Sequence, residues 1–319
     1  MSEKDTCLSI WDLSSIGGSR AWLRRENTEV DAVGTSNTNQ RNGENVMSLT
    51  KSDTLRVPGA NLYYEVCGSG PILLLIHGGG GDARAFNGIA KHLVSQYTVV
   101  TYDRRGLSRS TLDDPAEEQQ VEMHSDDAYH LLVAVTSEPA YVFGSSGGAV
   151  VGLDLVARYP DQVRTLIAHE PPSHLLSGLE ERHDTIREIS RREGATSAMQ
   201  QFMAQIGVTY DDREPDADLP EQGERPIENT MFLLKREFAM YDRYQFDFAA
   251  LKLASTQTRI VIAAGQSGRE YVGYQNAVAM ADKLRTTVVE FPGHHVGYVS
   301  HPRAFAEQLH NVLDDEQGK

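Results

Sequence analysis

Short apolar runs alternate along the chain with segments whose apolar residues recur every three to four positions. The runs cover residues 71–78, 97–106, 140–144, 163–172, 258–265 and 286–293; the helically spaced segments cover 82–95, 125–137, 147–160, 276–285 and 301–315. Ahead of them, residues 53–57 and 60–66 flank Pro58-Gly59 and predict a hairpin. An unbroken apolar run is typical of a strand buried on both faces. The alternation therefore predicts an α/β fold with a mostly parallel central sheet covered by helices on both faces.

Two segments do not follow this rhythm. Residues 1–46 are largely polar and have no period of two or 3.6, so we expect a disordered N-terminal tail. Met47 opens the folded part, 47–319, and the preceding residues are either a gene-model extension or a native flexible tail. The second segment, about 173–256, has helical patterns only, together with an acidic, proline-containing stretch at 211–226. We expect it to form a helical cap over one end of the sheet, inserted between the strand ending near Glu170 and the strand starting near Arg259.

Composition narrows the classes of partner. The chain has 45 acidic and 30 basic residues, a formal net charge of −15, which disfavours nucleic acid as a partner. Its two cysteines, Cys7 and Cys67, are too few for a disulfide framework or a thiolate metal site. Neither a signal peptide nor an apolar run of membrane-spanning length is visible. We therefore expect a cytoplasmic protein with no membrane association. The sequence carries no signal for an oligomeric state.

Candidate chemistry begins at a glycine-rich bend between a buried strand and a helix. Residues 144–148 read Gly-Ser-Ser-Gly-Gly and match G-x-S-x-G centred on Ser146. Centring the motif on Ser145 instead would require glycine at Phe143. In this motif a tight strand-to-helix turn lifts the serine hydroxyl above the sheet, and small neighbours leave room for the backbone. The alternative is a plain glycine-rich turn. The pattern favours Ser146 as a nucleophile.

A second glycine run supplies partners for that chemistry. His77 is followed by four glycines at the end of an earlier apolar run. Acyl transfer places negative charge on the carbonyl oxygen, which two backbone N–H groups must bind. We expect Gly147 and Gly79 to form this oxyanion hole and His77 to be structural. The run lacks the Lys-Ser/Thr ending of a P-loop and the spacing of a dinucleotide-binding loop.

Together these segments resemble the α/β-hydrolase family over about residues 52–315. The resemblance depends on HGGGG at 77–81, YDRRGLSRS at 102–110, GSSGGA at 144–149 and a late histidine before His301-Pro302. It implies the α/β-hydrolase fold and an order of serine, acid and histidine along the chain. It also implies that the turn at 103–106 is structural rather than catalytic.

The resemblance further implies a histidine base in the loop after the last strand. Relatives place this base seven positions before the proline that opens the last helix, which here is His295; His294 is the alternative, and His301 is expected at the surface. The usual acid position after the strand at 258–265 holds no carboxylate, since residues 265–268 read Gly-Gln-Ser-Gly. Some members carry the acid after the preceding strand, which favours Glu170. Glu270 is the alternative acid. Either glutamate could instead be a solvated loop carboxylate without a catalytic role.

These residues imply two-step acyl transfer without a cofactor or metal. The function favoured is a serine hydrolase of a carboxylic ester or lactone of a small molecule. A C–C hydrolase and a cofactor-free haloperoxidase-like enzyme would use the same triad. A receptor-like member with incidental turnover and a silent structural homologue are further alternatives. Phe232, Phe238, Met240 and Tyr241 could line the substrate pocket, although at helical spacing such residues are more often packing residues.

Overall fold

The computed structural model describes residues 50–218 and 225–315. The strands are β1 (Lys51–Val57), β2 (Ala60–Gly68), β3 (Ile72–Ile76), β4 (Thr98–Tyr102), β5 (Thr111–Leu112), β6 (Ala140–Ser145), β7 (Val163–His169), β8 (Arg259–Gly265) and β9 (Val288–Phe291). The α-helices are α2 (Asn87–Leu93), α3 (Val121–Val135), α4 (Gly147–Arg158), α5 (Leu179–Glu193), α6 (Ala195–Gln205), α7 (Pro226–Phe232), α8 (Phe238–Arg243), α9 (Phe248–Ala254), α10 (Val272–Leu284), α11 (Gly297–Ser300) and α12 (Pro302–Asp314). Four short helices complete the set: the 3-10 helices η1 (Ala83–Phe86), η2 (Pro160–Gln162) and η4 (Gln266–Gly268), and the π-helix η3 (Leu233–Glu237).

The strands of the described residues form one nine-stranded sheet in the order β1-β2-β4-β3-β6-β7-β8-β9, with β5 paired to β2. β1 and β2 form the expected antiparallel hairpin, and β2 also runs antiparallel to β4. From β4 to β9 every pair is parallel. The carboxyl ends of these strands therefore lie along one edge of the sheet, which is where ligands bind in open α/β folds.

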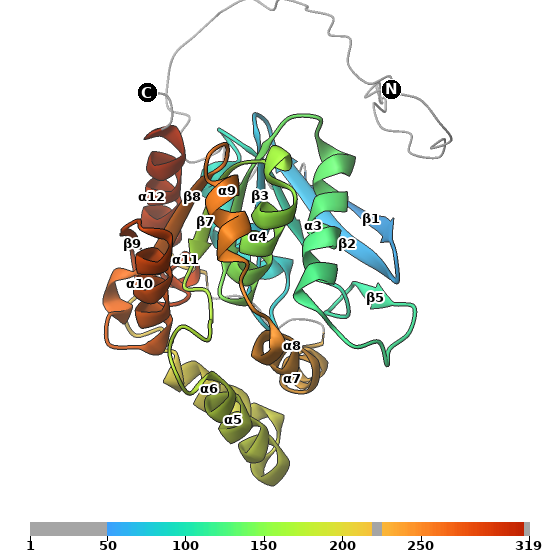
Figure 1. The fold of residues 1–319 in the computed structure, drawn as a ribbon, viewed down its shortest axis with the longest axis vertical. Coiled ribbons are helices and arrows are strands. Elements are labelled where there is room, and N and C mark those ends of the chain that lie inside the picture. The colour runs from blue at the N-terminus through green and yellow to red at the C-terminus, as the bar shows by residue number, and fades with distance from the viewer. Residues whose placement is uncertain (1–49, 219–224, 316–319) are drawn as a thin grey trace, which may run out of the picture. The chain divides into compact units, whose positions relative to one another are not determined.

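Alternate residues of the central strands face two separate hydrophobic clusters. On β3, Leu74 and Ile76 belong to a cluster with α3, α4, α9 and α10, whereas Leu73 and Leu75 belong to a cluster with α2, α11 and α12. Because side chains of a strand point alternately to opposite faces, a strand covered on both sides must be apolar throughout. Figure 1 shows helices on both sides of the sheet. The predicted mostly parallel, doubly covered sheet is confirmed.

One helix begins earlier than the sequence predicted. The helix expected over 125–137 is α3, which begins at Val121. Ser125 therefore lies inside the helix, and its hydroxyl contacts the Glu122 carbonyl and the Asp154 carboxylate on α4. Serine is common at helix starts, but here its hydroxyl bonds within the helix and to a neighbouring helix, so it does not mark the first turn.

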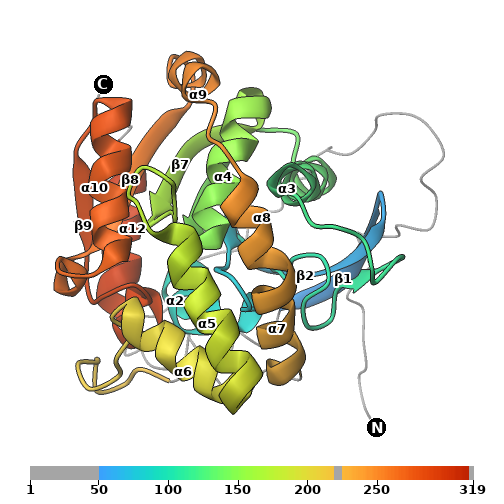
Figure 2. The ribbon, with the colours of Figure 1, turned by 60° about the horizontal axis from the view of Figure 1, so that its bottom comes forward.

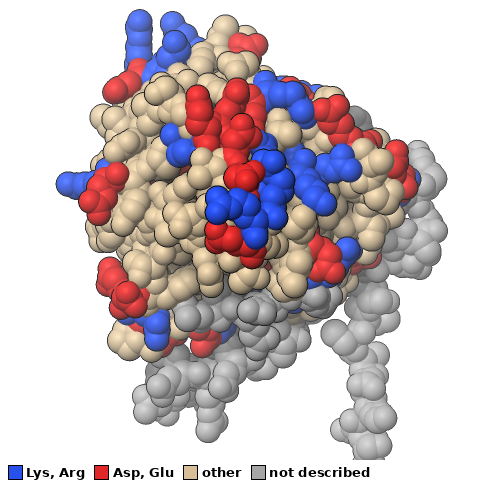
Figure 3. All heavy atoms as spheres, turned by 90° about the horizontal axis from the view of Figure 1, so that it is seen from below, with Lys and Arg blue, Asp and Glu red and all other residues tan. Residues whose placement is uncertain are grey.

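Every described helix or strand between β7 and β8 is a helix, as the pattern predicted, but these helices fall into two groups. Near the carboxyl ends of the strands, α5, α6 and the continuous run α7–η3–α8 lie together (Figures 1 and 2). They share a small apolar cluster formed by Ile186, Ala198, Leu233, Leu234 and Phe238. By contrast, α9 lies within the expected cap range 173–256 but packs on the sheet. It contributes Leu251 and Ala254 to the cluster shared with α3, α4 and α10. Figure 3 views this end of the molecule and shows basic side chains beside acidic ones, so the charge there is mixed.

Two further expectations from the sequence concern the N-terminal residues and membrane-spanning helices. The proposed tail, 1–46, and the candidate start at Met47 lie outside the described residues. Within 50–218 and 225–315, no helix combines the length and the apolar character required to cross a membrane.

A histidine lies unpaired at the end of β7. His169 is fully buried among Phe143, Phe291 and Phe305, and within the described structure neither of its ring nitrogens has a hydrogen-bond partner. Burial lowers the pKa of His169 to about 4; the adjacent Glu170 carboxylate opposes this, and His295 and His294 add to it. His169 is therefore neutral in the folded protein, whereas in the unfolded chain it titrates near its ordinary pKa of about 6.5.

We expect this histidine to make folding stability pH-dependent. Between pH 7 and pH 5 His169 becomes protonated in the unfolded chain but stays neutral in the folded protein. The free energy of unfolding therefore falls as pH falls. The part due to His169 is about 2 kcal/mol, and His169→Leu should abolish that part of the pH dependence. Urea unfolding of both proteins at the two pH values measures it. Equal pH dependence in the two proteins would contradict the assignment.

Candidate active site

The bend after β6 is a strained turn. β6 ends at Ser145, Ser146 has φ 53° and ψ −119°, and α4 starts at Gly147. A non-glycine residue with positive φ is rare and is found where the surrounding structure enforces it. The neighbouring glycines are required by close backbone approach: a β-carbon at Gly144 would lie 2.4 Å from the Gly148 carbonyl oxygen, and one at Gly148 would lie 2.1 Å from that of Ile76. The turn has the geometry that the motif predicted.

The two serines of the bend point to different places. Ser146 lines a cavity at the carboxyl edge of the sheet. Ser145 is fully buried, and its hydroxyl lies 3.5 Å from that of Tyr298. Only Ser146 is therefore placed to meet a ligand in this cavity.

Glu170 follows β7 directly and is also held in a left-handed conformation, with φ 49°. Its side chain is 2% exposed, and Oε1 accepts a hydrogen bond of 2.9 Å from the backbone N–H of Gly265 on β8. Its own backbone N–H donates to the Ala263 carbonyl, 2.9 Å away. The carboxylate is thus fixed between two strand ends and directed along the edge of the sheet.

The partner of this carboxylate is His295, in the loop after β9. His295 Nδ1 and Glu170 Oε2 are 2.5 Å apart, and both side chains are buried. Burial acts to raise the pKa of Glu170, but the hydrogen bond and charge of His295, with His169 and the Gly265 amide, outweigh it and hold the pKa below its ordinary value. An ionised Glu170 fixes the tautomer with a proton on Nδ1, which leaves Nε2 of His295 as the basic nitrogen. Ser146, Glu170 and His295 all line the same cavity.

The alternative residues lie elsewhere. Glu270 is exposed, and its backbone carbonyl accepts a bond from Gln275. The Nε2 of His294 contacts the Thr209 carbonyl. His301 contacts Ser300 and is 3.6 Å from Asp212. Of the two acids and three histidines considered, the structure brings together Glu170 and His295.

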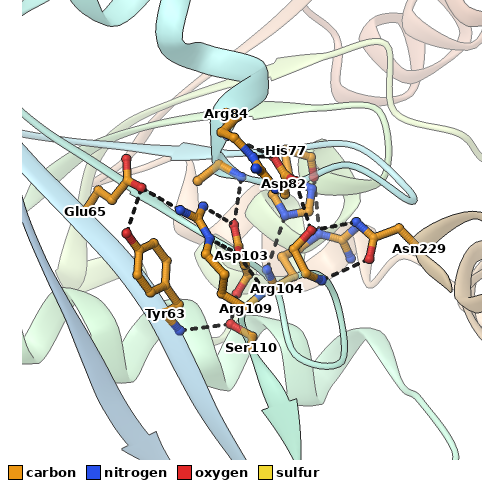
Figure 4. Close-up of polar contacts among 12 residues, drawn as sticks. Tyr63, Glu65, His77, Asp82, Arg84, Asp103, Arg104, Arg109, Ser110 and Asn229 are labelled. Atoms are coloured by element: carbon orange, nitrogen blue, oxygen red, sulfur yellow. Dashed lines mark hydrogen bonds and ion pairs between the residues drawn. The ribbon is translucent and has the colours of Figure 1, made fainter. Parts of the chain in front are cut away.

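Gly79 lines the cavity and belongs to a loop, 77–81, that lies against the bend at Ser146. Buried His77 holds this loop: Nδ1 is 2.8 Å from the Gly78 carbonyl, and Nε2 accepts from the Arg104 backbone N–H at 3.2 Å. Burial, with the Arg104 charge, lowers the pKa of His77 to about 4, so the ring is neutral and can accept at Nε2. The Arg104 guanidinium donates to the carbonyls of His77 and Gly78, at 3.2 and 2.9 Å. Figure 4 shows His77 and Arg104 in this network.

The helical segment contributes a carboxylate to the same loop, which the sequence analysis missed. Glu237, the last residue of η3, is fully buried and forms a 2.6 Å ion pair with Arg104. Its Oε2 accepts the backbone N–H of Gly80 at 2.8 Å, and its Oε1 accepts the Tyr241 hydroxyl at 3.2 Å. Burial acts to lower the pKa of Arg104, but the Glu237 carboxylate outweighs it and holds the pKa above its ordinary value. The only sequence signal was a glutamate among apolar residues in MFLLKREFAMY, 231–241.

A second contact joins the helical segment to the core. Asn229 of α7 is buried and forms two hydrogen bonds with Ser108. Its Oδ1 accepts from the Ser108 backbone N–H at 2.9 Å, and its Nδ2 donates to the Ser108 hydroxyl at 2.8 Å. The Ser108 hydroxyl in turn donates to Asp82 at 2.9 Å. In the same turn, Asp103 accepts from the Arg109 side chain and from the Ala83 backbone. These contacts give the turn at 103–110 a structural role, because they join it to α7 and to the segment at 82–83.

The cavity has an apolar lining with a few polar groups. It is open to solvent, and the empty space within it, counted together with that opening, is about 630 Å³. Its lining residues are Gly79, Ser146, Glu170, Pro172, Leu179, Arg182, His183, Phe202, Gln205, Ile206, Leu233, Phe238, Tyr241, Val272, Gly273, Asn276 and His295. Of the four candidate pocket residues, Phe238 and Tyr241 line it; Phe232 lies against Gly106, and Met240 packs beside Val150. Among residues 50–218 and 225–315, no three histidine, cysteine or acidic side chains are grouped to hold a metal ion.

Comparison with known proteins agrees with this architecture. Residues 71–199 match the family profile described as alpha/beta hydrolase fold. The chain is 45% identical over 267 residues to the uncharacterized hydrolase YraK of Bacillus subtilis, covering 83% of this chain and 96% of that protein. It is 29% identical over 270 residues to a zearalenone hydrolase of Cladophialophora bantiana, covering 81% of this chain and 95% of that protein. A solved thermophilic esterase from Thermogutta terrifontis aligns with a TM-score of 0.66 at 20% identity, covering 83% of this chain and 98% of that one. The chain is therefore a hydrolase that belongs to the α/β-hydrolase fold family.

Proposed function

We propose that this hydrolase cleaves a carboxylic ester or lactone of a small molecule through an acyl-enzyme intermediate. In this proposal Ser146 is the nucleophile, His295 the general base and acid, and Glu170 the carboxylate that orients the imidazole. The amides of Gly147 and Gly79 bind the oxyanion. No cofactor takes part.

The reaction proceeds in two steps. His295 Nε2 takes the Ser146 proton as Oγ attacks the carbonyl carbon, and the carbonyl oxygen becomes an oxyanion facing the two amides. The C–O bond to the leaving alcohol then breaks, and the alcohol leaves with the proton from His295. In the second step His295 deprotonates a water that attacks the acyl group, and Ser146 recovers its proton as the acid is released. Glu170 stays ionised throughout and stabilises the imidazolium.

The observation that carries this proposal is the buried 2.5 Å pair of His295 and Glu170 in one cavity with a serine at positive φ. The carboxylate fixes the proton on Nδ1, so Nε2 is left to act on the serine. The zearalenone hydrolase adds support, since that relative is named for hydrolysis of a lactone.

The acid assignment is tested by comparing two glutamates. We expect Glu170→Gln to lower turnover of a p-nitrophenyl ester about a thousandfold or more, because the imidazole loses the partner that holds its tautomer. Glu270→Gln should leave turnover nearly unchanged, since that side chain is exposed and does not line the cavity. Steady-state kinetics of the two variants checks this. Loss of activity in Glu270→Gln alone would overturn the assignment.

The nucleophile is tested by covalent labelling. A fluorophosphonate should label the peptide that contains Ser146, and Ser146→Ala should abolish both the label and the burst of p-nitrophenol. Labelling at another serine, or ester turnover that survives in Ser146→Ala, would exclude the acyl-enzyme mechanism at this site. A receptor-like member would bind ligands without such a burst.

The buried pair of Arg104 and Glu237 should set the stability of the loop that carries Gly79. We expect Glu237→Gln to cost about 3–5 kcal/mol in unfolding free energy, because it leaves a buried guanidinium without its counter-charge. The double variant Arg104→Met with Glu237→Met should recover part of that loss. Its turnover should stay low, because Gly80 and Gly78 lose their partners and a displaced oxyanion donor costs up to about 10²–10³ in rate.

The control is an exposed pair on the same run of helices. Arg243 of α8 and Glu118 form a 2.8 Å ion pair with both side chains more than half exposed. The double variant Arg243→Met with Glu118→Met should change neither stability nor turnover appreciably, as is usual for a surface pair. If the Arg104 and Glu237 double variant retained full turnover, the loop would not depend on this pair.

A further inference from the structure

The wall of the cavity formed by α5 presents a cation with unused hydrogen-bonding capacity. Arg182 lies in the second turn of α5 and lines the cavity that contains Ser146 and His295. One guanidinium nitrogen, Nη1, donates to the Ser177 carbonyl at 3.1 Å. The other, Nη2, is buried and has no hydrogen-bond partner in the part of the chain that the structure describes. A buried donor left without an acceptor is costly, so it points to an acceptor supplied from outside the chain.

The acidic residues near this guanidinium do not neutralise it. No ion pair of the described residues includes Arg182, although the exposed Glu181 is its neighbour in sequence. Glu170 is the one carboxylate among the described residues lining the cavity, and both its oxygens are engaged, by His295 and by Gly265. Burial lowers the pKa of Arg182, and the charge of Glu181 only partly opposes this, which is the signature of a cation lacking a counter-charge.

The helix that carries Arg182 is held firmly against α8. The adjacent residue, His183, forms a 2.5 Å contact from Nδ1 to Asp242 and stacks on Phe238 with ring centroids 3.9 Å apart. Arg187, one turn further along, donates to the other oxygen of Asp242 at 2.9 Å. Because α8 directly follows η3 and its buried Glu237, the position of Arg182 is fixed relative to the loop at 77–81. A cation on a fixed element can select ligands by geometry as well as by charge.

Most of the other residues that line the cavity are apolar, among them Leu179, Phe202, Leu233 and Phe238. A ligand that suits these groups has a carbonyl for Ser146, an apolar body, and an anionic oxygen for Arg182. A planar guanidinium matches a carboxylate well, because two N–H groups can face two oxygens.

We propose that Arg182 forms a subsite for a carboxylate on the substrate, remote from the bond that is cleaved. The preferred substrates are then half-esters of dicarboxylic acids, or lactones that bear a free acid group. This inference depends on the proposed function for the identity of the scissile bond, but the anion subsite itself is independent of it. Arg182 is a specificity-determining residue, and neutral esters should react without its help.

Ligand binding tests the subsite without any turnover. The Ser146→Ala protein is titrated by calorimetry with the monomethyl esters of adipic, suberic and sebacic acids, and with the corresponding dimethyl esters, which lack the charge. We expect at least one monoester to bind with a Kd at least about tenfold lower than its diester, the scale of one charge-assisted hydrogen bond. Adding Arg182→Gln should remove that preference.

The matched control is an arginine on the same helix. Arg191 is largely exposed and pairs with Glu188, so Arg191→Gln removes one positive charge from α5 without touching the cavity. The preference for the monoester should survive this change. The subsite is refuted if no monoester binds better than its diester, if the preference persists in Arg182→Gln, or if Arg191→Gln abolishes it equally. Circular dichroism of each variant verifies folding.

Turnover separates this inference from the proposed function. In the protein with Ser146 intact, kcat/KM for p-nitrophenyl hydrogen suberate should exceed that for p-nitrophenyl octanoate, and Arg182→Gln should lower only the first value. If both esters react equally well, the carboxylate subsite is wrong and the esterase proposal stands. If neither reacts while the monoester still binds through Arg182, the subsite stands and the ester hydrolase proposal is wrong.

Discussion

The parallel register of β6 and β7 is the constraint on which the site depends. Ser145 and His169 are paired residues at the ends of these strands, and the Ser146 backbone N–H donates to the His169 carbonyl at 2.8 Å. The residues that follow the two strands, Ser146 and Glu170, then have positive φ angles. Two neighbouring strands thus stop at the same level, and after each of them a side chain of the candidate site turns over the edge of the sheet. Strain at two adjacent positions persists because the surrounding sheet over-determines both.

The same edge also holds a fully buried ion pair, that of Arg104 and Glu237. Transferring Arg104 and Glu237 from water into the interior is unfavourable, and attraction between them offsets it only where the remaining polar atoms are also bonded. Here the guanidinium meets two carbonyls of the loop at 77–81, and the carboxylate meets Gly80 and Tyr241. The pair therefore joins three segments distant in sequence, and a π-helix, a form enriched at functional sites, sets the carboxylate in place.

Most of the fold could be predicted from the sequence because its signals are local. Apolar runs gave the central strands, and Pro58-Gly59 gave the hairpin. Ser146 could be singled out because its turn needs glycine at fixed offsets. The pairing of Glu170 with His295 needed more, since 125 residues separate them and a resemblance to known relatives supplied the positions. Arg182 and Glu237 could not be identified from the sequence for a physical reason. In their surroundings, LEERHD and LLKRE, they resemble solvated charges on a helix, and only tertiary packing shows that they turn inward.

The bond between Glu237 and Gly80 links positions 157 residues apart, one in the segment that lines the candidate cavity and one beside the proposed oxyanion donor. The inserted segment that lines the candidate cavity is consequently also a scaffold for the loop at 77–81. Evolution of new specificity by exchanging the whole inserted segment would carry a hidden requirement: each replacement must bring its own inward-facing acid at this depth. Drift at cavity-lining positions of α6, such as Gln205, leaves the bond between Glu237 and Gly80 in place and is the less constrained route to new substrates.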